Sequence, residues 1–348
     1  MAENHNPAEE EPVCKTWARL VEVVLGLFLL VGTGFMAHYY APPPPPLSLP
    51  LPSNPVADSD RKRETQQEER QREALQQSEL QQNELRQLTR DVDELKQEQA
   101  MPALVLNRYR NSICYIFGIY RVAMPRKRPA LRARISGTGF VVAEGLLATN
   151  RHVAQPWYGD SEADALIRKG AKPELEKLVA FFPGFPLPVD ITPLVFSAHG
   201  DLAVLRVENS EAISRLRPLP LADKQSDPGE LVAVVGYPMG VLGMVAKSPP
   251  AVYDRLAYRR DDIGAANELA ALSLIRPSAT CGHLGDVVGD KLIYDAPTAH
   301  GGSGGPVFNS QGEVIGINEA YIDGFSGGTL GVSVQALRPL IAAAQKRQ

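Results

Sequence analysis

A glycine-rich run near the end of the chain constrains the fold more than any other segment. Residues 300–306 read His-Gly-Gly-Ser-Gly-Gly-Pro, so that one serine stands between two pairs of glycines. Glycine lets the backbone turn sharply, and such a turn lets neighbouring N–H groups converge on one point. The same composition is typical of a flexible linker. The run alone therefore leaves a nucleophile loop and a linker as alternatives.

Two upstream segments favour the catalytic interpretation. Residues 147–154 form an apolar strand that leads into His152, and residues 199–205 place Asp201 at the start of a second apolar strand. A single histidine or aspartate at a strand end is often only a turn or capping residue. Together with Ser303, however, the two follow the order His, Asp, Ser, which is one of the three known chain orders of the same catalytic triad.

The three segments resemble chymotrypsin- or trypsin-like serine proteases, and their flanking residues resemble the HtrA/Deg branch. The matching motifs are T-N-x-H-V at 149–153, D-L-A-x-L at 201–205 and G-x-S-G-G-P at 301–306. The segments 137–142 and 234–240 resemble two further strands of that family. The resemblance covers the chain from Pro102 onward. It implies a mainly β fold of two six-stranded antiparallel β-barrels, at about 113–207 and 230–334, with the triad between them.

The resemblance also implies a role for each site residue. Ser303 is expected to be the nucleophile, His152 its base and Asp201 the group that orients the imidazole, while the N–H groups of Gly301 and Ser303 bind the oxyanion. The walls of the substrate pocket are expected to come from five residues, namely Asn318, Glu319, Ala320, Tyr321 and Gly331. Such a serine endopeptidase needs no cofactor or metal ion.

The pocket floor gives an expectation about specificity. Pro297 stands six residues before the serine, roughly where digestive relatives keep this floor, and it is not acidic. Preference for Lys or Arg then lacks its counter-charge. We expect cleavage after small or medium apolar residues.

The N-terminal part of the chain predicts a membrane anchor. Residues 20–40 are mostly apolar, and about 20 such residues span a hydrocarbon core of about 30 Å. A cleaved signal peptide is the alternative, but no small-x-small cleavage site is evident. Lys15 and Arg19 precede the span, so the positive-inside rule places residues 1–19 in the cytoplasm. The protease is then expected in the periplasm or an equivalent extracytoplasmic space, attached to a bacterial-type inner membrane.

A spacer and a stalk are expected between membrane and protease. Residues 41–57 are proline-rich and suit a stiff spacer, whereas residues 58–101 are charged, rich in glutamine and predicted to be helical. The stalk repeats apolar residues at coiled-coil spacing over about two heptads, at Leu85, Leu88, Val92 and Leu95. A solvated single helix and a self-associating one both fit this pattern. Pro102 is expected to end the helix, and residues 102–348 to form the protease domain, too short to include a PDZ domain.

Within this domain we expect three helical additions. A charged insertion at 160–176 is expected to include a helix, residues 265–272 form a second helix inside the insertion 253–275, and residues 335–348 form a terminal helix.

Composition excludes other classes. Lys plus Arg number 36 against 40 Asp plus Glu, a net charge of −4, which gives a nucleic-acid partner no electrostatic support. Cys14, Cys114 and Cys281 have no metal-binding spacing, and the last two could equally form a disulfide or be free thiols. Two functions remain: a membrane-anchored endopeptidase acting on protein or peptide substrates, or a catalytically silent, protease-like scaffold assembled through its stalk.

Overall fold

The computed structural model describes residues 56–124, 129–321 and 328–348. The predicted cytoplasmic tail, membrane span and nearly all of the proline-rich spacer lie outside these residues. Among the helices that are described, none combines the length and the hydropathy needed to cross a bilayer. The chain divides into two compact units between Leu80 and Gln81, and the second unit contains the barrels.

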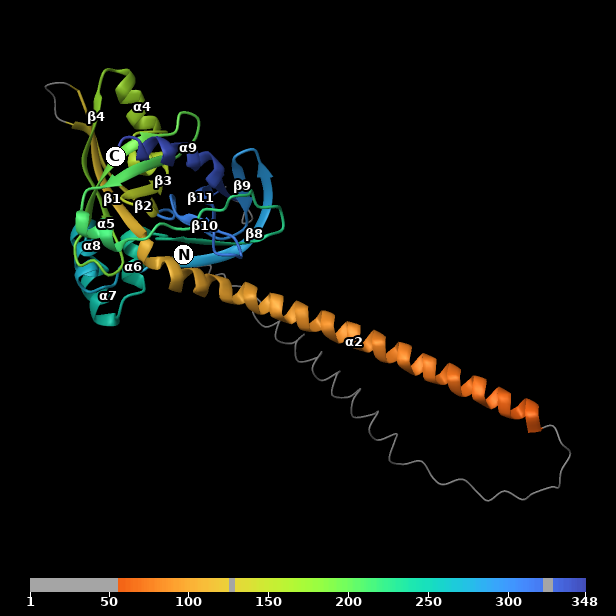
Figure 1. Ribbon diagram of the computed structural model, residues 1–348. Helices are drawn as coiled ribbons and strands as arrows, with labels where there is room; N and C mark the ends of the chain where they lie inside the picture. The colour runs from red at the N-terminus through yellow and green to blue at the C-terminus, as the bar shows by residue number, and fades with distance from the viewer. Residues whose placement is uncertain (1–55, 125–128, 322–327) are drawn as a thin grey trace, which may run out of the picture. The chain divides into compact units, whose positions relative to one another are not determined.

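The second unit contains two closed six-stranded barrels whose paired strands are antiparallel (Figure 1). The first barrel has the order β1-β2-β3-β6-β5-β4. Its strands are β1 (Ile113–Ala123), β2 (Pro129–Ala143), β3 (Leu146–Thr149), β4 (Lys172–Phe181), β5 (Val189–Phe196) and β6 (Ala203–Val207). The second barrel has the order β10-β11-β12-β9-β8-β7. Its strands are β7 (Leu231–Gly236), β8 (Ser278–Val288), β9 (Lys291–Tyr294), β10 (Pro306–Phe308), β11 (Val314–Tyr321) and β12 (Thr329–Ser333). Both predicted barrel ranges are confirmed.

The strands at the junction of the barrels are apolar on both faces. The first six residues of β1 and all four of β3 are buried, because one face fills the barrel and the other meets neighbouring elements. Tyr115 of β1 and Tyr237, just after β7, bring their rings to 5.8 Å across this junction. One apolar cluster accordingly contains buried residues from both barrels. This shared core gives the two barrels a common packing surface.

The helix α2 (Val56–Tyr109) differs from the prediction at its C-terminal end. Pro102 lies inside it, although a helix stop was expected there. Proline removes one i→i−4 hydrogen bond and crowds the preceding turn. Burial of Met101 and Val105, each 3% exposed, and stacking of Tyr109 on Phe308 at 5.4 Å between ring centroids offset that cost. The last turns of α2 are therefore part of the protease core.

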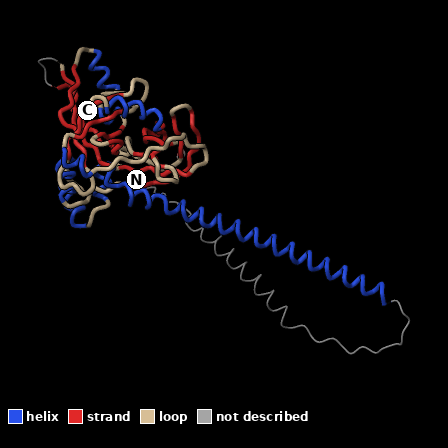
Figure 2. Tube along the Cα trace, in the orientation of Figure 1, coloured by secondary structure: helices blue, strands red, loops and turns tan. Residues whose placement is uncertain are grey.

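The helical additions match the prediction in part. The first insertion contains α4 (Ser161–Arg168), but its last residues belong to β4. The second insertion contains α8 (Asp262–Ala271), close to the predicted helix. Two helices that were not predicted precede α8, namely α6 (Gly240–Ala246) and α7 (Pro250–Leu256). These three helices follow β7 and lie together (Figure 2). Short helices α3 (Arg151–Ala154), α5 (Ser210–Arg215) and η1 (Arg110–Ser112) complete the domain.

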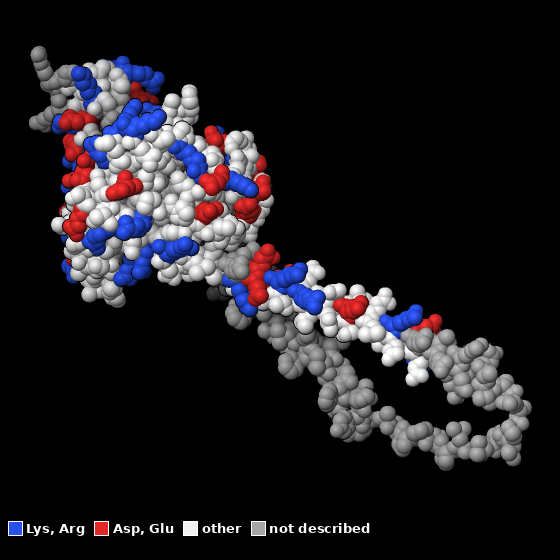
Figure 3. All heavy atoms as spheres, in the orientation of Figure 1, with Lys and Arg blue, Asp and Glu red and all other residues white. Residues whose placement is uncertain are grey.

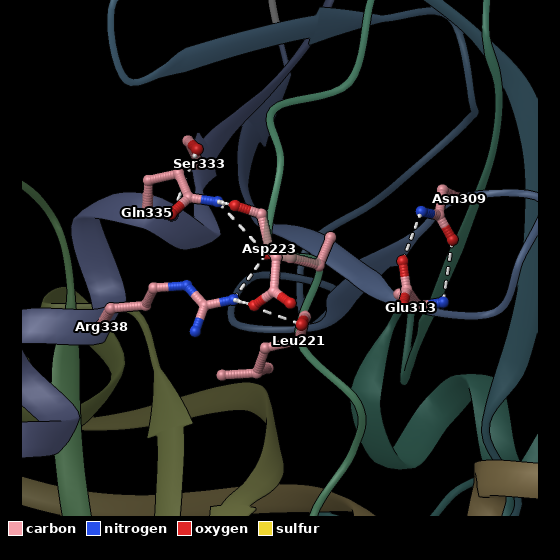
Figure 4. A network of polar contacts seen from close by, with 8 residues as sticks. Leu221, Asp223, Asn309, Glu313, Ser333, Gln335 and Arg338 are labelled. Atoms are coloured by element: carbon pink, nitrogen blue, oxygen red, sulfur yellow. Dashed lines mark hydrogen bonds and ion pairs between the residues drawn. The ribbon is translucent and has the colours of Figure 1, made fainter.

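The predicted terminal helix is α9 (Val334–Gln345), which contacts strands of both barrels. Arg338 donates to the Ala222 carbonyl at 2.7 Å and forms an ion pair with Asp223 at 2.9 Å (Figure 4). Gln335 donates to the same Ala222 carbonyl at 3.2 Å. The helix thereby fastens the segment that links the two barrels.

Two cysteines lie in the part of the chain that the structure describes. Cys114 is buried in β1, where desolvation raises the pKa of its thiol, and Cys281 is exposed on β8; both are free. No metal-ligating cluster occurs among the residues that the structure describes. Basic and acidic side chains intermingle on the barrel face seen in Figure 3, as the near-balanced charge suggests.

Candidate active site

Strand register brings the predicted base and aspartate together. Thr149, the last residue of β3, pairs with Ala203, the first residue of the antiparallel strand β6. The residues that follow β3 and those that precede β6 therefore leave the sheet at the same edge. His152 lies on α3, just beyond β3, and Asp201 lies in the loop just before β6.

The aspartate holds the histidine by two contacts. Asp201 Oδ2 lies 2.5 Å from His152 Nδ1, and Asp201 Oδ1 accepts the backbone N–H of His152 at 2.8 Å. The Asp201 side chain is 12% exposed and that of His152 is 31% exposed. A carboxylate beside Nδ1 favours the tautomer with the proton on that nitrogen. The other ring nitrogen, Nε2, is then left able to accept a proton.

Neighbouring residues fix the position of this pair. Asn150 Nδ2 donates to the Asp201 carbonyl at 2.8 Å, while Arg151 donates to the Ser197 carbonyl at 3.0 Å. The Arg151 guanidinium also lies 4.1 Å from the ring centroid of Tyr158. These three contacts join α3 and the residue before it to their surroundings, so the histidine has little freedom to shift.

The predicted nucleophile lies in the loop before β10. Gly304 N–H donates to the Asn318 carbonyl and Asn318 N–H to the Gly305 carbonyl, both at 2.8 Å, which ties this loop to β11. The Ser303 hydroxyl donates to the Glu319 carbonyl at 3.0 Å. No hydrogen bond joins Ser303 to His152, although both are described. Attack on a substrate therefore requires the hydroxyl to turn away from Glu319.

Two N–H groups of the nucleophile loop are free to bind an oxyanion. Within the described part of the chain, neither Gly301 N–H nor Ser303 N–H has a hydrogen-bond partner. Gly301 has φ +90°, and a Cβ there would lie 2.5 Å from the Tyr237 carbonyl oxygen. Only glycine fits that conformation and that approach. The run of glycines is thus a shaped loop and not a linker.

Glu319, a predicted pocket wall, lies at the same cavity as the predicted histidine–aspartate pair. It lines a cavity of about 540 Å³ together with His152 and Asp201, and Asp290 and Lys291 from the β8–β9 turn line the same cavity. Burial and the charge of Asp201 raise the pKa of the Glu319 carboxyl, whereas His152 and Lys291 oppose that rise. A second carboxylate therefore faces the aspartate–histidine pair.

Two other predicted pocket residues contact a buried tyrosine. Asn318 is 1% exposed; its Oδ1 accepts from the Tyr294 hydroxyl at 2.8 Å, and its Nδ2 donates to Thr298 at 3.1 Å. Gly331 pairs with Asn318, and a Cβ on it would lie 3.1 Å from the Tyr294 ring. The Asn318 amide is thus used within the protein. Of the remaining two, Ala320 and Tyr321, the structure gives the backbone in β11 and not the side chain.

Comparison with known proteins identifies the family. The family model described as a trypsin-like peptidase domain matches residues 137–317, more than half of the chain. A probable periplasmic serine endoprotease, DegP-like, from Rhizobium meliloti is 30% identical over 210 residues, which cover 60% of this chain and 32% of that protein. A glutamyl endopeptidase from Staphylococcus epidermidis is 27% identical over 194 residues, covering 54% of this chain and 55% of that enzyme. The chain thus spans about a third to a half of the length of these relatives.

Solved structures also match. The serine endoprotease from Yersinia pestis aligns with a TM-score of 0.44 and 16% identity over 70% of this chain and 65% of that one. The inactive form of the Rv3671c protease from M. tuberculosis aligns with a TM-score of 0.44 and 18% identity over 70% of this chain and 95% of that one. The family match covers all three segments around His152, Asp201 and Ser303. The chain belongs to the trypsin-like serine peptidase family.

Proposed function

We propose that this chain is a serine endopeptidase of the HtrA type that cleaves proteins with His152, Asp201 and Ser303. The observation that carries the proposal is the doubly held histidine beside Asp201, with a serine in the neighbouring loop that leaves two N–H groups unpaired. These are the parts that acyl transfer needs: an oriented base, a nucleophile and an oxyanion site.

The reaction assigns one step to each part. His152 Nε2 removes the Ser303 proton as Oγ attacks the scissile carbonyl, and the N–H groups of Gly301 and Ser303 bind the resulting oxyanion. His152 then protonates the leaving amine, which leaves an acyl group on Ser303. Water, deprotonated by the same imidazole, releases the acid and restores the serine. Asp201 stabilises the imidazolium in both halves of the reaction.

A substitution series tests this assignment. Ser303→Ala in the purified full-length chain should abolish casein and peptide hydrolysis, and His152→Ala should cost about as much, because the two residues act as a unit. Retained near-ultraviolet circular dichroism would show that the fold is intact. Hydrolysis that survives at the wild-type rate in either variant would overturn the assignment.

One hydrogen bond favours a second candidate function. The Ser303 hydroxyl donates to the Glu319 carbonyl and not to His152. A permanently fixed hydroxyl of this kind would suit a catalytically silent scaffold. Purified chain that binds other proteins but cleaves neither casein nor a peptide library would favour this alternative over the protease.

We further propose that the protease domain is extracytoplasmic and anchored by residues 20–40. The support is the apolar segment flanked by Lys15 and Arg19, together with the periplasmic description of the DegP-like relatives. A phosphatase fused after Gln348 should then be active and a fluorescent protein that folds only in the cytoplasm should be dark. The reverse pair of signals would place the domain in the cytoplasm.

Exposed apolar side chains of the predicted stalk support self-association of the chain. The apolar side chains at coiled-coil spacing are 46–66% exposed, at Leu85, Leu88, Val92 and Leu95. Pairing with a second copy would bury them. Sedimentation of the full-length chain and of a Leu88→Glu, Leu95→Glu variant tests this: an oligomer that the double substitution dissociates is expected, and an unchanged mass would contradict it.

A further inference from the structure

Thr138 is a buried threonine of β2 that contacts the nucleophile loop from the other barrel. It is fully buried, with neighbouring glycines on both sides in the sequence. Its Oγ1 donates to the Gly301 carbonyl at 2.7 Å and accepts the Tyr237 N–H at 3.0 Å. Its own N–H donates to the Ser303 carbonyl at 2.8 Å. One residue of the first barrel therefore holds two carbonyls of the loop.

The hydroxyl of Thr138 uses its only proton in this network. An N–H group can only donate, so the Tyr237 contact fixes Oγ1 as its acceptor, and the single hydroxyl proton is left for the Gly301 carbonyl. Thr138, Tyr237 and Gly301 are all buried, so water does not replace either bond. A side chain without a hydroxyl would leave one donor and one acceptor unpaired.

The loop is fixed peptide by peptide around the two oxyanion donors. The His300 carbonyl accepts the Met239 N–H at 2.6 Å, and the Gly302 carbonyl accepts the Gly305 N–H at 3.1 Å. A trans peptide is planar, so its N–H points opposite to its C=O. These two bonds therefore set the directions of the Gly301 and Ser303 N–H groups, which are the unpaired ones.

Thr138 fixes the peptides that follow each donor. The peptide after Gly301 is held at its carbonyl by Oγ1 and at its N–H by the Ala299 carbonyl, 2.9 Å from Gly302 N. The peptide after Ser303 is held at its carbonyl by the Thr138 N–H. With both sides of Gly301 and the far side of Ser303 restrained, the Gly301 N–H cannot rotate without breaking its peptide's bond to the Tyr237–Gly240 turn, and the Ser303 N–H cannot rotate without breaking the Gly302–Gly305 bond.

That turn carries a strained residue. Gly240 N–H donates to the Tyr237 carbonyl at 2.9 Å, which closes a four-residue turn, and Met239 occupies its third position with φ 61° and ψ 8°. This left-handed conformation usually requires glycine or asparagine and is strained for other residues. The strained residue is the one whose N–H donates to the His300 carbonyl. Thr138 Oγ1, by accepting from Tyr237, joins the same turn to the loop.

We propose that Thr138 is a positioning residue of the oxyanion site: its hydroxyl couples the first barrel and the Tyr237–Gly240 turn to the peptides that aim the Gly301 and Ser303 N–H groups. The inference rests on the proposed function. It assigns to the threonine of β2 a part in stabilising the transition state without contact with the substrate. A preorganised donor pair avoids reorganisation during the reaction, which is the main source of such stabilisation.

Three substitutions at one position test the proposal. Thr138→Val keeps the shape and removes the hydroxyl, Thr138→Ser restores it, and Thr138→Cys keeps the volume with a weak donor. Deleting an oxyanion donor typically lowers kcat about 100- to 1000-fold, so misaligning the pair should lower it at least about tenfold. We expect this loss in kcat for Thr138→Val with KM changed less than about threefold, a rate near wild type for Thr138→Ser, and an intermediate rate for Thr138→Cys.

A matched control separates positioning from stability. Asn309→Ala removes the hydrogen bonds that Asn309 Oδ1 accepts from the backbone N–H groups of Gln311 and Glu313 in the β10–β11 turn. It should lower the thermal midpoint without lowering kcat; the contact with Glu313 is drawn in Figure 4. A peptidyl boronate measures the oxyanion site directly, and its affinity should fall in parallel with kcat across the Thr138 variants and stay at the wild-type value in Asn309→Ala. If Thr138→Val does not fold, Thr138→Cys against Thr138→Ser gives the same comparison.

The outcomes are distinguishable from failure of the protease assignment. An active wild type with Thr138→Val at the wild-type kcat and boronate affinity would overturn only the positioning role. Equal impairment of Thr138→Ser and Thr138→Val would also overturn it, since the hydroxyl would then be irrelevant. An inactive wild-type chain would overturn both the proposed function and the role of Thr138.

Discussion

Asp201→Asn is the perturbation whose effect follows most directly from the site geometry. The carboxylate uses one oxygen for the His152 N–H at 2.8 Å and the other for Nδ1 at 2.5 Å. An asparagine has only one side-chain oxygen. If that oxygen keeps the backbone N–H, the amide NH₂ faces Nδ1, which must then accept, and the imidazole proton moves to Nε2. The base would lose its ability to take the Ser303 proton.

The wrong tautomer has a large, specific kinetic effect. Such a change lowers kcat about 10⁴-fold in a triad of this kind, which is about 5 kcal/mol of transition-state stabilisation. The effect on folding is smaller: a charge-assisted bond contributes about 1.5–3 kcal/mol, and asparagine keeps part of it. We therefore expect a folded protein whose kcat is about 10⁴-fold below wild type but still above that of Ser303→Ala.

Steady-state hydrolysis of a fluorogenic peptide, with urea denaturation in parallel, measures both quantities. Asp190→Asn is the matched control, because it replaces a carboxylate by an amide in the same way but in β5, away from the site. It should leave kcat unchanged. A loss of less than about tenfold for Asp201→Asn would refute the argument that the aspartate sets the tautomer.

The remaining predictions concern pH, stability and specificity. Because burial and the charge of Asp201 raise the pKa of Glu319 in the folded state, the folded chain binds this proton more tightly than the unfolded chain does, so stability should fall as pH rises from the unfolded pKa through the folded pKa. Urea denaturation across this pH range should show a smaller fall for Glu319→Gln, and an equal fall in both proteins would contradict this. Met101→Ala should cost about 2–5 kcal/mol in urea denaturation, whereas Leu104→Ala, at a position 61% exposed, should stay within about 0.5 kcal/mol; equal midpoints would show that α2 is not part of the core. Since Pro297 is not acidic and Tyr294 lies against the predicted pocket walls, a peptide library should show cleavage after small or medium apolar residues; dominant cleavage after Lys or Arg would refute this.

The sequence allowed prediction of the barrels because their signals are local. Short motifs carry the resemblance to chymotrypsin-like proteases that implied both barrel ranges, and β1 to β12 fall within them. The continuation of α2 past Pro102 could not be predicted from local signals. A proline favours a helix stop on local grounds, and only burial of Met101 and Val105 against the distant barrels allows α2 to continue.

The site residues also divide into those that local motifs predict and those whose contacts join distant parts of the chain. The motifs around His152, Asp201 and Ser303 predicted that pair and loop, but the contacts of Thr138 join segments about 100 and 160 residues apart in the chain. The spacing of residues in the sequence does not predict contacts over such separations. A threonine between two glycines in an apolar strand was the available signal. Glu319 was predicted as a pocket wall, and its cavity beside Asp201 depends on the pairing of β11 with its neighbours.

Labelling with a fluorophosphonate tests the central claim most directly, because only an activated serine reacts quickly. The full-length chain is exposed to the label, digested and examined by mass spectrometry. The account predicts a single phosphonyl adduct on Ser303, which is absent from His152→Ala and strongly slowed in Asp201→Asn. A wild-type chain that takes up no label, or one that is labelled at Ser303 equally fast without His152, would contradict it.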